Sequence, residues 1–281
     1  MHRVVAAVAA TVMLAATAAG CAGRDEAGTG APSTAAAPRQ HPSELVGLWR
    51  VSGAQGEEPD TWLRLDARSL RVLRACGSLE GAWRGDGTAF VGSVFGWSSS
   101  CSLDSPSVPW LDRTATYRLV DDGAELRAAD GSVVATLSID GAPGGYDDIA
   151  DELTTAPTPQ PTELAALDRV TAPPRGVRLA TAADLVGSWK PADLDVDTDP
   201  GLTFGADGTY SSSDGCNRVR GRWAVSAAGT FLATSGFSTL VGCEGAPVDS
   251  WVHDARWASI EHGRLVLIDA AGRALGRLDR A

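Results

Sequence analysis

The chain has 281 residues, 24 of them basic and 35 acidic, which gives a net charge of −11 at pH 7. This charge argues against nucleic-acid binding and against broad electrostatic docking on an anionic membrane, because no basic segment is evident that would displace counterions from phosphates. After the N-terminal segment described next, about 240 residues remain, a length that suits two cores of roughly 100 residues each.

The first residues have the pattern of an export signal. One arginine precedes an uncharged apolar stretch at 4–19, and small residues lead to Cys21, as in a secretory signal peptide. Residues 17–21 resemble a bacterial lipobox, which implies cleavage after residue 20 and acylation of Cys21. An ordinary cleaved signal peptide and an uncleaved anchor are the alternatives, although the stretch is short for a membrane span of roughly 20 apolar residues. We expect 1–20 to be a lipoprotein signal peptide.

The next segment, 21–42, is rich in Ala, Gly, Pro, Ser and Thr and has no hydrophobic periodicity. Such a segment buries too little apolar surface to offset its ordering entropy. It is therefore expected to be a disordered tether that holds the folded part away from the membrane.

An internal repeat sets the domain organisation. Residues 45–49 read LVGLW and residues 185–189 read LVGSW, at an offset of 140. The same offset relates Cys76 to Cys216, Gly81 to Gly221 and Trp83 to Trp223, while Cys101 and Cys243 differ by 142. Rare residues recurring in the same order indicate a duplicated domain. We predict domain 1 at 43–140 and domain 2 at 182–281.

Between the repeats, 141–181 is expected to be a linker. Its centre, 156–162, reads APTPQPT, and this proline spacing favours an extended, semi-rigid spacer. The flanks have the composition to form short helical pieces. Two domains with some freedom to reorient would follow.

Within the second copy, short apolar runs alternate with turn signals. Strands are expected at 202–204, 209–212, 221–225, 230–233, 264–268 and 273–278, separated by Asp-Gly and Ala-Gly turns. Close spacing of this kind is typical of an antiparallel meander that curls or closes. One segment differs, because Val248, Trp251, Val252 and Ala255 recur at helical spacing after a proline. A helix within 247–257 is therefore predicted to lie across the sheet.

The second copy resembles the META domain, also called the HslJ-like domain, of bacterial envelope lipoproteins. The likeness lies in the LVGSW stretch at 185–189, in Gly215-Cys216-Asn217 followed by Gly221, in Phe237-Ser238-Thr239 with Cys243, and in the predicted helix. The first copy is more divergent, with Cys76-Gly77-Ser78 in place of Cys-Asn. The resemblance implies a mainly β (α+β) fold of two tandem, partly open antiparallel barrels, each with one helix. It implies no catalytic residues.

Four cysteines remain if Cys21 carries lipid, and an even number in an oxidising compartment is typical of disulfides. Within the repeats we predict Cys76–Cys101 and Cys216–Cys243. The second closes a loop of about 28 residues and is worth roughly 3.5 kcal/mol, and the first is worth nearly the same. A nucleophilic cysteine needs a nearby histidine, and the second copy has only His253 and His262. A zinc site needs tighter ligand spacing. The disulfides are favoured over both alternatives.

Other motifs give weaker signals. The acidic run 193–199 imitates the start of a calcium loop, but the sixth and twelfth positions counted from Asp195 are Pro200 and Ala206, where an EF-hand needs glycine and glutamate. A solvated acidic loop is favoured. Neither a Gly-x-Ser-x-Gly elbow nor a phosphate-binding loop is found. No catalytic residue, metal or cofactor is therefore expected.

These features together predict an extracytoplasmic lipoprotein attached to the cell membrane through its N-terminal lipid. We expect it to act as a non-catalytic interaction module in envelope stress or maintenance, with an unknown envelope protein as partner. The alternative is a carrier that holds a small hydrophobic ligand inside a barrel, since barrel mouths are common ligand sites.

Overall fold

The computed structural model describes residues 40–281 except 100–107, 145, 147–148, 195, 240 and 243. The signal segment, Cys21 and most of the tether lie outside the described residues, as do Cys101 and Cys243. Within the described part of the chain, no helix is long and apolar enough to cross a membrane.

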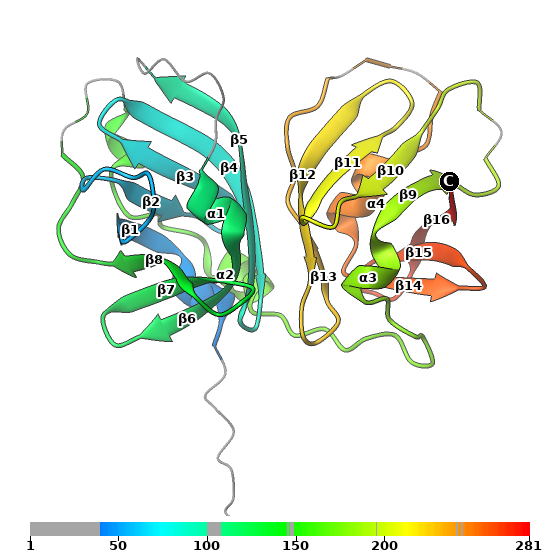
Figure 1. Cartoon of the computed structure of the whole chain (residues 1–281), viewed down its shortest axis with the longest axis horizontal. Helices are drawn as coiled ribbons and strands as arrows, with labels where there is room; N and C mark the ends of the chain where they lie inside the picture. The colour runs from blue at the N-terminus through cyan, green and yellow to red at the C-terminus, as the bar shows by residue number, and fades with distance from the viewer. Residues whose placement is uncertain are drawn as a thin grey trace, which may run out of the picture. The chain divides into compact units, whose positions relative to one another are not determined.

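The first half of the described chain forms an eight-stranded antiparallel barrel in which each strand pairs with the next (Figure 1). Its strands are β1 (Gly47–Ser52), β2 (Trp62–Leu65), β3 (Ser69–Arg74), β4 (Gly77–Asp86), β5 (Ala89–Ser99), β6 (Thr114–Val120), β7 (Gly123–Ala128) and β8 (Val133–Ser138). Pairing of β8 with β1, in the register Arg50 opposite Ser138, closes the barrel. The predicted mainly β fold of small antiparallel barrels is confirmed for this half, where β1 and β8 satisfy each other's edge groups.

The second half forms another eight-stranded antiparallel sheet, in the order β13-β12-β11-β10-β9-β16-β15-β14. Its strands are β9 (Gly187–Pro191), β10 (Gly201–Phe204), β11 (Thr209–Ser213), β12 (Arg218–Val225), β13 (Phe231–Ala233), β14 (Trp257–Glu261), β15 (Arg264–Ile268) and β16 (Ala274–Arg280). The Phe231 amide donates to the Arg256 carbonyl at 2.9 Å, which brings the two end strands close. The sheet is thus ring-like, as predicted, and the expected strands of this copy are confirmed.

Helices are few and short. They are η1 (Pro42–Leu45), α1 (Pro109–Arg113), η2 (Asp151–Leu153), α2 (Pro161–Leu167), α3 (Ala182–Leu185) and α4 (Val248–Asp254). Helix α4 confirms the predicted helix but ends before Trp257, which begins β14. The Arg256 amide donates to the Ile268 carbonyl at 2.8 Å, so strand pairing ends the helix although the apolar spacing would continue it.

The repeated LVGxW stretch has the same local structure in both halves. The Trp49 indole donates to the Leu45 carbonyl at 2.8 Å, and the Trp189 indole donates to the Leu185 carbonyl at 2.7 Å. Both tryptophans are buried in the cores of their sheets. The repeat therefore encodes a turn that enters the first strand and is locked by an indole hydrogen bond.

The repeated glycines, Gly81 and Gly221, lie where the backbone has no room for a side chain. A Cβ atom on Gly81 would lie 2.1 Å from the Ser93 carbonyl oxygen. On Gly221 it would lie 2.7 Å from the Tyr210 ring and 2.8 Å from the Thr234 carbonyl oxygen. Close approach of chain segments, and not turn geometry, explains why both copies carry glycine here.

Each sheet encloses its own apolar core. In the first, Trp83 stacks on Phe90 with ring centroids 5.7 Å apart, and Tyr117 is also buried. In the second, Phe204 packs against Trp223 at 4.8 Å between centroids. Inward-facing side chains alternate with outward-facing ones, as in β7, where Ala124, Leu126 and Ala128 are buried and their neighbours are partly exposed.

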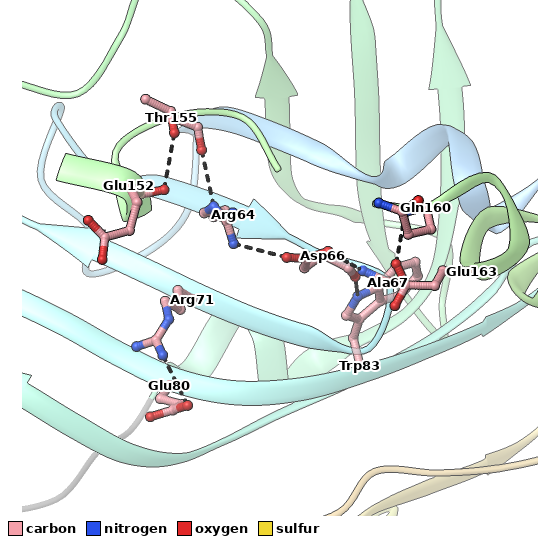
Figure 2. Close-up of polar contacts among 10 residues, drawn as sticks. All are labelled: Arg64, Asp66, Ala67, Arg71, Glu80, Trp83, Glu152, Thr155, Gln160 and Glu163. Carbon is pink, nitrogen blue, oxygen red and sulfur yellow. Dashed lines mark hydrogen bonds and ion pairs between the residues drawn. The ribbon is translucent and has the colours of Figure 1, made fainter. Parts of the chain in front are cut away.

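The segment between the sheets packs along the first barrel. The Tyr146 hydroxyl donates to Asp60 at 2.8 Å, and Ile149 is buried against Trp62. The Arg64 guanidinium donates to the Thr155 carbonyl at 3.1 Å (Figure 2). Further along, Leu167 packs against the first core. The predicted short helical pieces are present as η2 and α2, but much of the linker is fixed to the barrel surface.

Candidate functional site

The cysteines singled out in the sequence lie in turns at equivalent places. Cys76 lies between β3 and β4, and Cys216 lies between β11 and β12. Because Cys101 and Cys243 are outside the described residues, the pairings Cys76–Cys101 and Cys216–Cys243 stay predictions, as does lipidation of Cys21.

The turn containing Cys216 is held by a dense hydrogen-bond network. The Asp214 carboxylate accepts from the backbone amides of Cys216 at 2.8 Å and Asn217 at 2.6 Å, and from the Asn217 side chain at 2.8 Å. The Asn217 amide also bonds both backbone groups of Val241 at 2.8 Å and accepts from Thr239 at 2.6 Å. Asn217 therefore holds its own turn together and also fastens the distant segment around Val241.

Replacing Asn217 with alanine is expected to lower the free energy of unfolding by about 2 kcal/mol. Asn217 is buried and makes these bonds with its side chain, and a net bond is worth about 1 kcal/mol. The expected loss is smaller than the sum of these hydrogen bonds because Thr239 and Val241 are exposed. In the variant, water can bind their polar groups in place of the Asn217 side chain. Urea unfolding measures it, with Thr239→Ala as a milder comparison; equal stability of Asn217→Ala and the parent would contradict the expectation.

The same turn gives a pH dependence. Burial raises the pKa of Asp214, but hydrogen bonds from Asn217 and the backbone outweigh it and lower the pKa below its usual value. Since the folded-state pKa is depressed, the contribution to stability is present above about pH 3.9 and is lost as pH falls through the folded value. Urea unfolding at pH 7, 5 and 3 measures the free energy of unfolding. The difference in this free energy between the parent and Asp214→Asn should become smaller towards pH 3. A constant difference would contradict this.

The acidic run at 193–199 behaves as a solvated loop where it is described. Asp193 pairs with Arg264 at 3.1 Å and Asp199 pairs with Lys190 at 2.7 Å, both with exposed carboxylates. Asp195 lies outside the described residues. Across the described part of the chain, no group of three or more His, Cys, Asp or Glu side chains is placed to hold a metal ion.

A hollow of about 820 Å³ lies between β12 and β5, and we call it the arginine groove. Arg218, Arg220 and Arg222 line it from one side, because their side chains alternate with the inward-facing Val219 and Trp223 along β12. Three cations therefore follow one face of a strand in a chain of net charge −11. The sequence at 218–222 has the alternation R-x-R-x-R. The net charge of the whole chain, which is acidic, gives no sign of this local basic cluster.

Two aromatic side chains also line the groove. Phe95 of β5 and Phe237, which follows β13, meet edge to face with ring centroids 4.7 Å apart. Phe237 remains 64% exposed, and Trp97 on the same strand as Phe95 is 52% exposed. Large exposed aromatic side chains in one place mark binding surfaces more often than isolated apolar residues do.

The three arginines differ in whether they already have hydrogen-bond or ion-pair partners within the protein. Arg222 lies 3.9 Å from the Asp112 carboxylate and donates to the Asp207 carbonyl at 3.1 Å. Burial raises the pKa of Asp112, and Arg222 acts in the opposite direction. Arg218 and Arg220 are exposed and have no hydrogen-bonded or ion-paired partner among the described residues. Arg222 is thus positioned by the protein, while the other two are available to a ligand.

Comparison with known families identifies the C-terminal part of the chain. A family model for the META domain matches residues 183–281. This region is a META domain. An NMR structure of a protein from Burkholderia xenovorans shares 19% identity over 41% of this chain and 95% of that one, with a TM-score of 0.28. No curated protein matches the chain.

The META domain supplies the arginines and Phe237, whereas Phe95 and Asp112 come from the first barrel. The two halves touch beside the groove, where the Ser93 hydroxyl donates to that of Thr234 at 2.8 Å and both are buried. The arginine groove therefore needs both halves. The assignment of the first barrel as a second, divergent META-like domain stays a prediction, based on the shared LVGxW turn and the repeated glycines.

Proposed function

We propose that this protein is an extracytoplasmic lipoprotein, anchored through acylated Cys21, that acts without catalysis as an interaction module of the envelope. The signal pattern and the lipobox-like residues support the anchor, and the META domain supports the assignment to an envelope protein. The 21–42 tether would then let the folded part reach partners away from the membrane surface. This role agrees with the absence of a recognised catalytic motif in the sequence.

The partner that fits best is an acidic segment of another envelope protein that also carries apolar side chains. The observation that carries this proposal is that Arg218 and Arg220, which have no ion-pair partner among the described residues, line the same groove as the exposed Phe237 ring. Guanidinium groups bind carboxylates in bidentate geometry, and aromatic and arginine side chains are the commonest interface anchors. Charge complementarity would select an acidic partner even though the chain as a whole is acidic.

A carrier function receives less support. The interior of the first barrel is occupied by its own side chains, including Trp83, Phe90 and Tyr117, which are almost fully buried. A small hydrophobic ligand needs a preformed apolar cavity of a few hundred cubic ångströms. The arginine groove is instead open and lined by charged groups.

The test uses the full-length lipoprotein in detergent and fluorescent peptides of alternating Glu and Phe. Anisotropy should show binding that weakens with salt and falls at least tenfold in Arg218→Gln/Arg220→Gln, because each charged contact contributes about 1.5–3 kcal/mol. Arg277→Gln, an exposed position on β16, is the charge control and should bind normally. A Lys/Phe peptide should not bind.

Equal affinity of the double variant and the parent would refute the groove as the binding site, and equal binding of the Lys/Phe peptide would refute the selection for acidic partners. The anchor is tested separately by intact mass spectrometry of the protein purified from membranes. Acylation of Cys21 adds lipid mass to a chain that begins at residue 21, whereas an ordinary signal peptide leaves no lipid.

A further inference from the structure

A second hollow, of about 280 Å³, lies away from the arginine groove, between β4 and helix α4. We call it the Arg84 hollow. Its titratable lining residues are Arg68, Arg84, Arg256, His253, Asp254 and Glu163. None of these residues lines the arginine groove. Three guanidinium groups from two sheets therefore surround one small space.

Arg84 is the unusual member of this set. Its side chain is largely enclosed, and its hydrogen bond goes to the Trp83 carbonyl at 2.9 Å. Among the described residues no carboxylate lies within ion-pair distance of it. Burial lowers the pKa of Arg84, and the charge of Arg68 lowers it further. Buried charges in proteins are normally paired with an opposite charge. Within the described part of the chain, no anion offsets the desolvation of this guanidinium.

The neighbouring acids do not supply that anion. Asp86 is occupied by Arg256 at 3.2 Å and by the Ser226 hydroxyl at 2.7 Å. Glu163 caps its own helix, with its carboxylate accepting from the Gln160 amide at 2.8 Å (Figure 2). Asp254 is exposed at the end of α4.

The remaining polar groups of the hollow suit an anion. Arg68 is exposed, has no ion-pair partner among the described residues and lies close enough to Arg84 to affect its charge. Burial lowers the pKa of His253, and Arg84 lowers it further, while Asp254 opposes the shift. His253 is therefore neutral at pH 7 and has one ring N–H to donate.

We propose that the Arg84 hollow binds a phosphate-class oxyanion, held by the guanidinium groups of Arg84 and Arg68, with His253 and the free donors of Arg256 completing the site. Planar guanidinium groups match the geometry of phosphate oxygens. The ligand is either free phosphate or the phosphate of a lipid headgroup, which would bring the folded part back to the membrane to which it is tethered.

Calorimetric titration of the full-length protein in detergent with inorganic phosphate tests the site. Binding is expected, and Arg84→Gln and the exposed Arg68→Gln should each weaken it at least tenfold. Arg175→Gln, an exposed linker arginine, is the matched charge control and should bind as the parent does. Phosphate should also raise the thermal midpoint of the parent but not of Arg84→Gln, since a ligand stabilises only the state that binds it.

Vesicles separate the two sources of phosphate. The full-length protein, held in nanodiscs of the phosphate-free glycolipid digalactosyldiacylglycerol, is presented with vesicles of phosphatidylglycerol or, as the control, with vesicles of digalactosyldiacylglycerol. Arg84-dependent recruitment to phosphatidylglycerol together with phosphate binding assigns a headgroup, and phosphate binding without recruitment assigns the free ion. No phosphate binding, or binding unchanged in both Arg84→Gln and Arg68→Gln, overturns the proposal. Either outcome leaves the peptide test of the arginine groove unaffected.

Discussion

Replacing Trp189 with alanine should lower the free energy of unfolding by about 4 kcal/mol. The indole is 2% exposed within the core of the META domain and donates to the Leu185 carbonyl at 2.7 Å. The Arg280 guanidinium also lies over its ring, 4.3 Å from the centroid. Truncation would leave a cavity, remove the hydrogen bond that fixes the entry to β9 and remove the ring on which the Arg280 guanidinium lies. Denaturant unfolding followed by circular dichroism measures the change.

Two further variants sharpen this test. Trp189→Phe should lose only about 1–2 kcal/mol, because the ring volume is mostly kept while the indole N–H is lost. Trp97→Ala, at a position that is 52% exposed on β5, should change stability by less than about 1 kcal/mol. If Trp189→Ala and Trp97→Ala lower the free energy of unfolding equally, the burial of Trp189 in the LVGxW turn does not account for its contribution to stability.

Replacing Asp86 with alanine should cost about 3 kcal/mol, the second-largest effect expected. Asp86 ends β4, and its carboxylate holds Arg256 at 3.2 Å and the Ser226 hydroxyl at 2.7 Å. The two charged side chains are only 15% and 21% exposed. Removing one partner leaves a mostly buried cation, which is the costly way to break an ion pair. Burial already lowers the pKa of Arg256, and Asp86 counteracts this effect.

A double-mutant cycle isolates the pair. Arg256→Met replaces the cation with an apolar chain of similar length, and Asp86→Ala/Arg256→Met should be more stable than the sum of the single losses predicts, by about 1–3 kcal/mol. Thermal and urea unfolding of the four proteins provide the cycle. Strict additivity would show that Asp86 and Arg256 do not support each other and that contact between the halves has another basis.

Much of the fold follows from local signals. The repeat placed Trp49 and Trp189 in equivalent turns, and Asp207-Gly208 correctly marked the turn between β10 and β11. Turn residues and alternating apolar positions act over a few neighbouring residues, so their effect can be predicted from the local sequence. The end of α4 was missed because hydrogen bonds of Arg256 to Phe231 and Ile268, which lie elsewhere in the sheet, override the helical spacing.

The candidate sites illustrate the opposite case. Arg220 and Phe95 belong to different sheets, and nothing in either local sequence says that they line one groove. Likewise, the local sequence around Arg84 is typical of an ordinary strand. Only the folded structure brings Arg84, His253 and Arg256 to the same hollow. The net charge of the chain sums these arginines with a larger number of acidic residues, so it does not indicate that the arginines cluster.

The sequence alone predicted the duplication and determined the strand-rich class and the META resemblance, because repeated residues and the spacing of turns are properties of the chain read in order. Tertiary structure decided the closure of the first barrel, the fixing of the linker and both arginine-lined hollows. These depend on contacts such as Ser93 with Thr234, 141 residues apart. Such contacts form only when hydrogen-bond ladders and packed cores bring distant segments together, and short-range propensities carry no record of them.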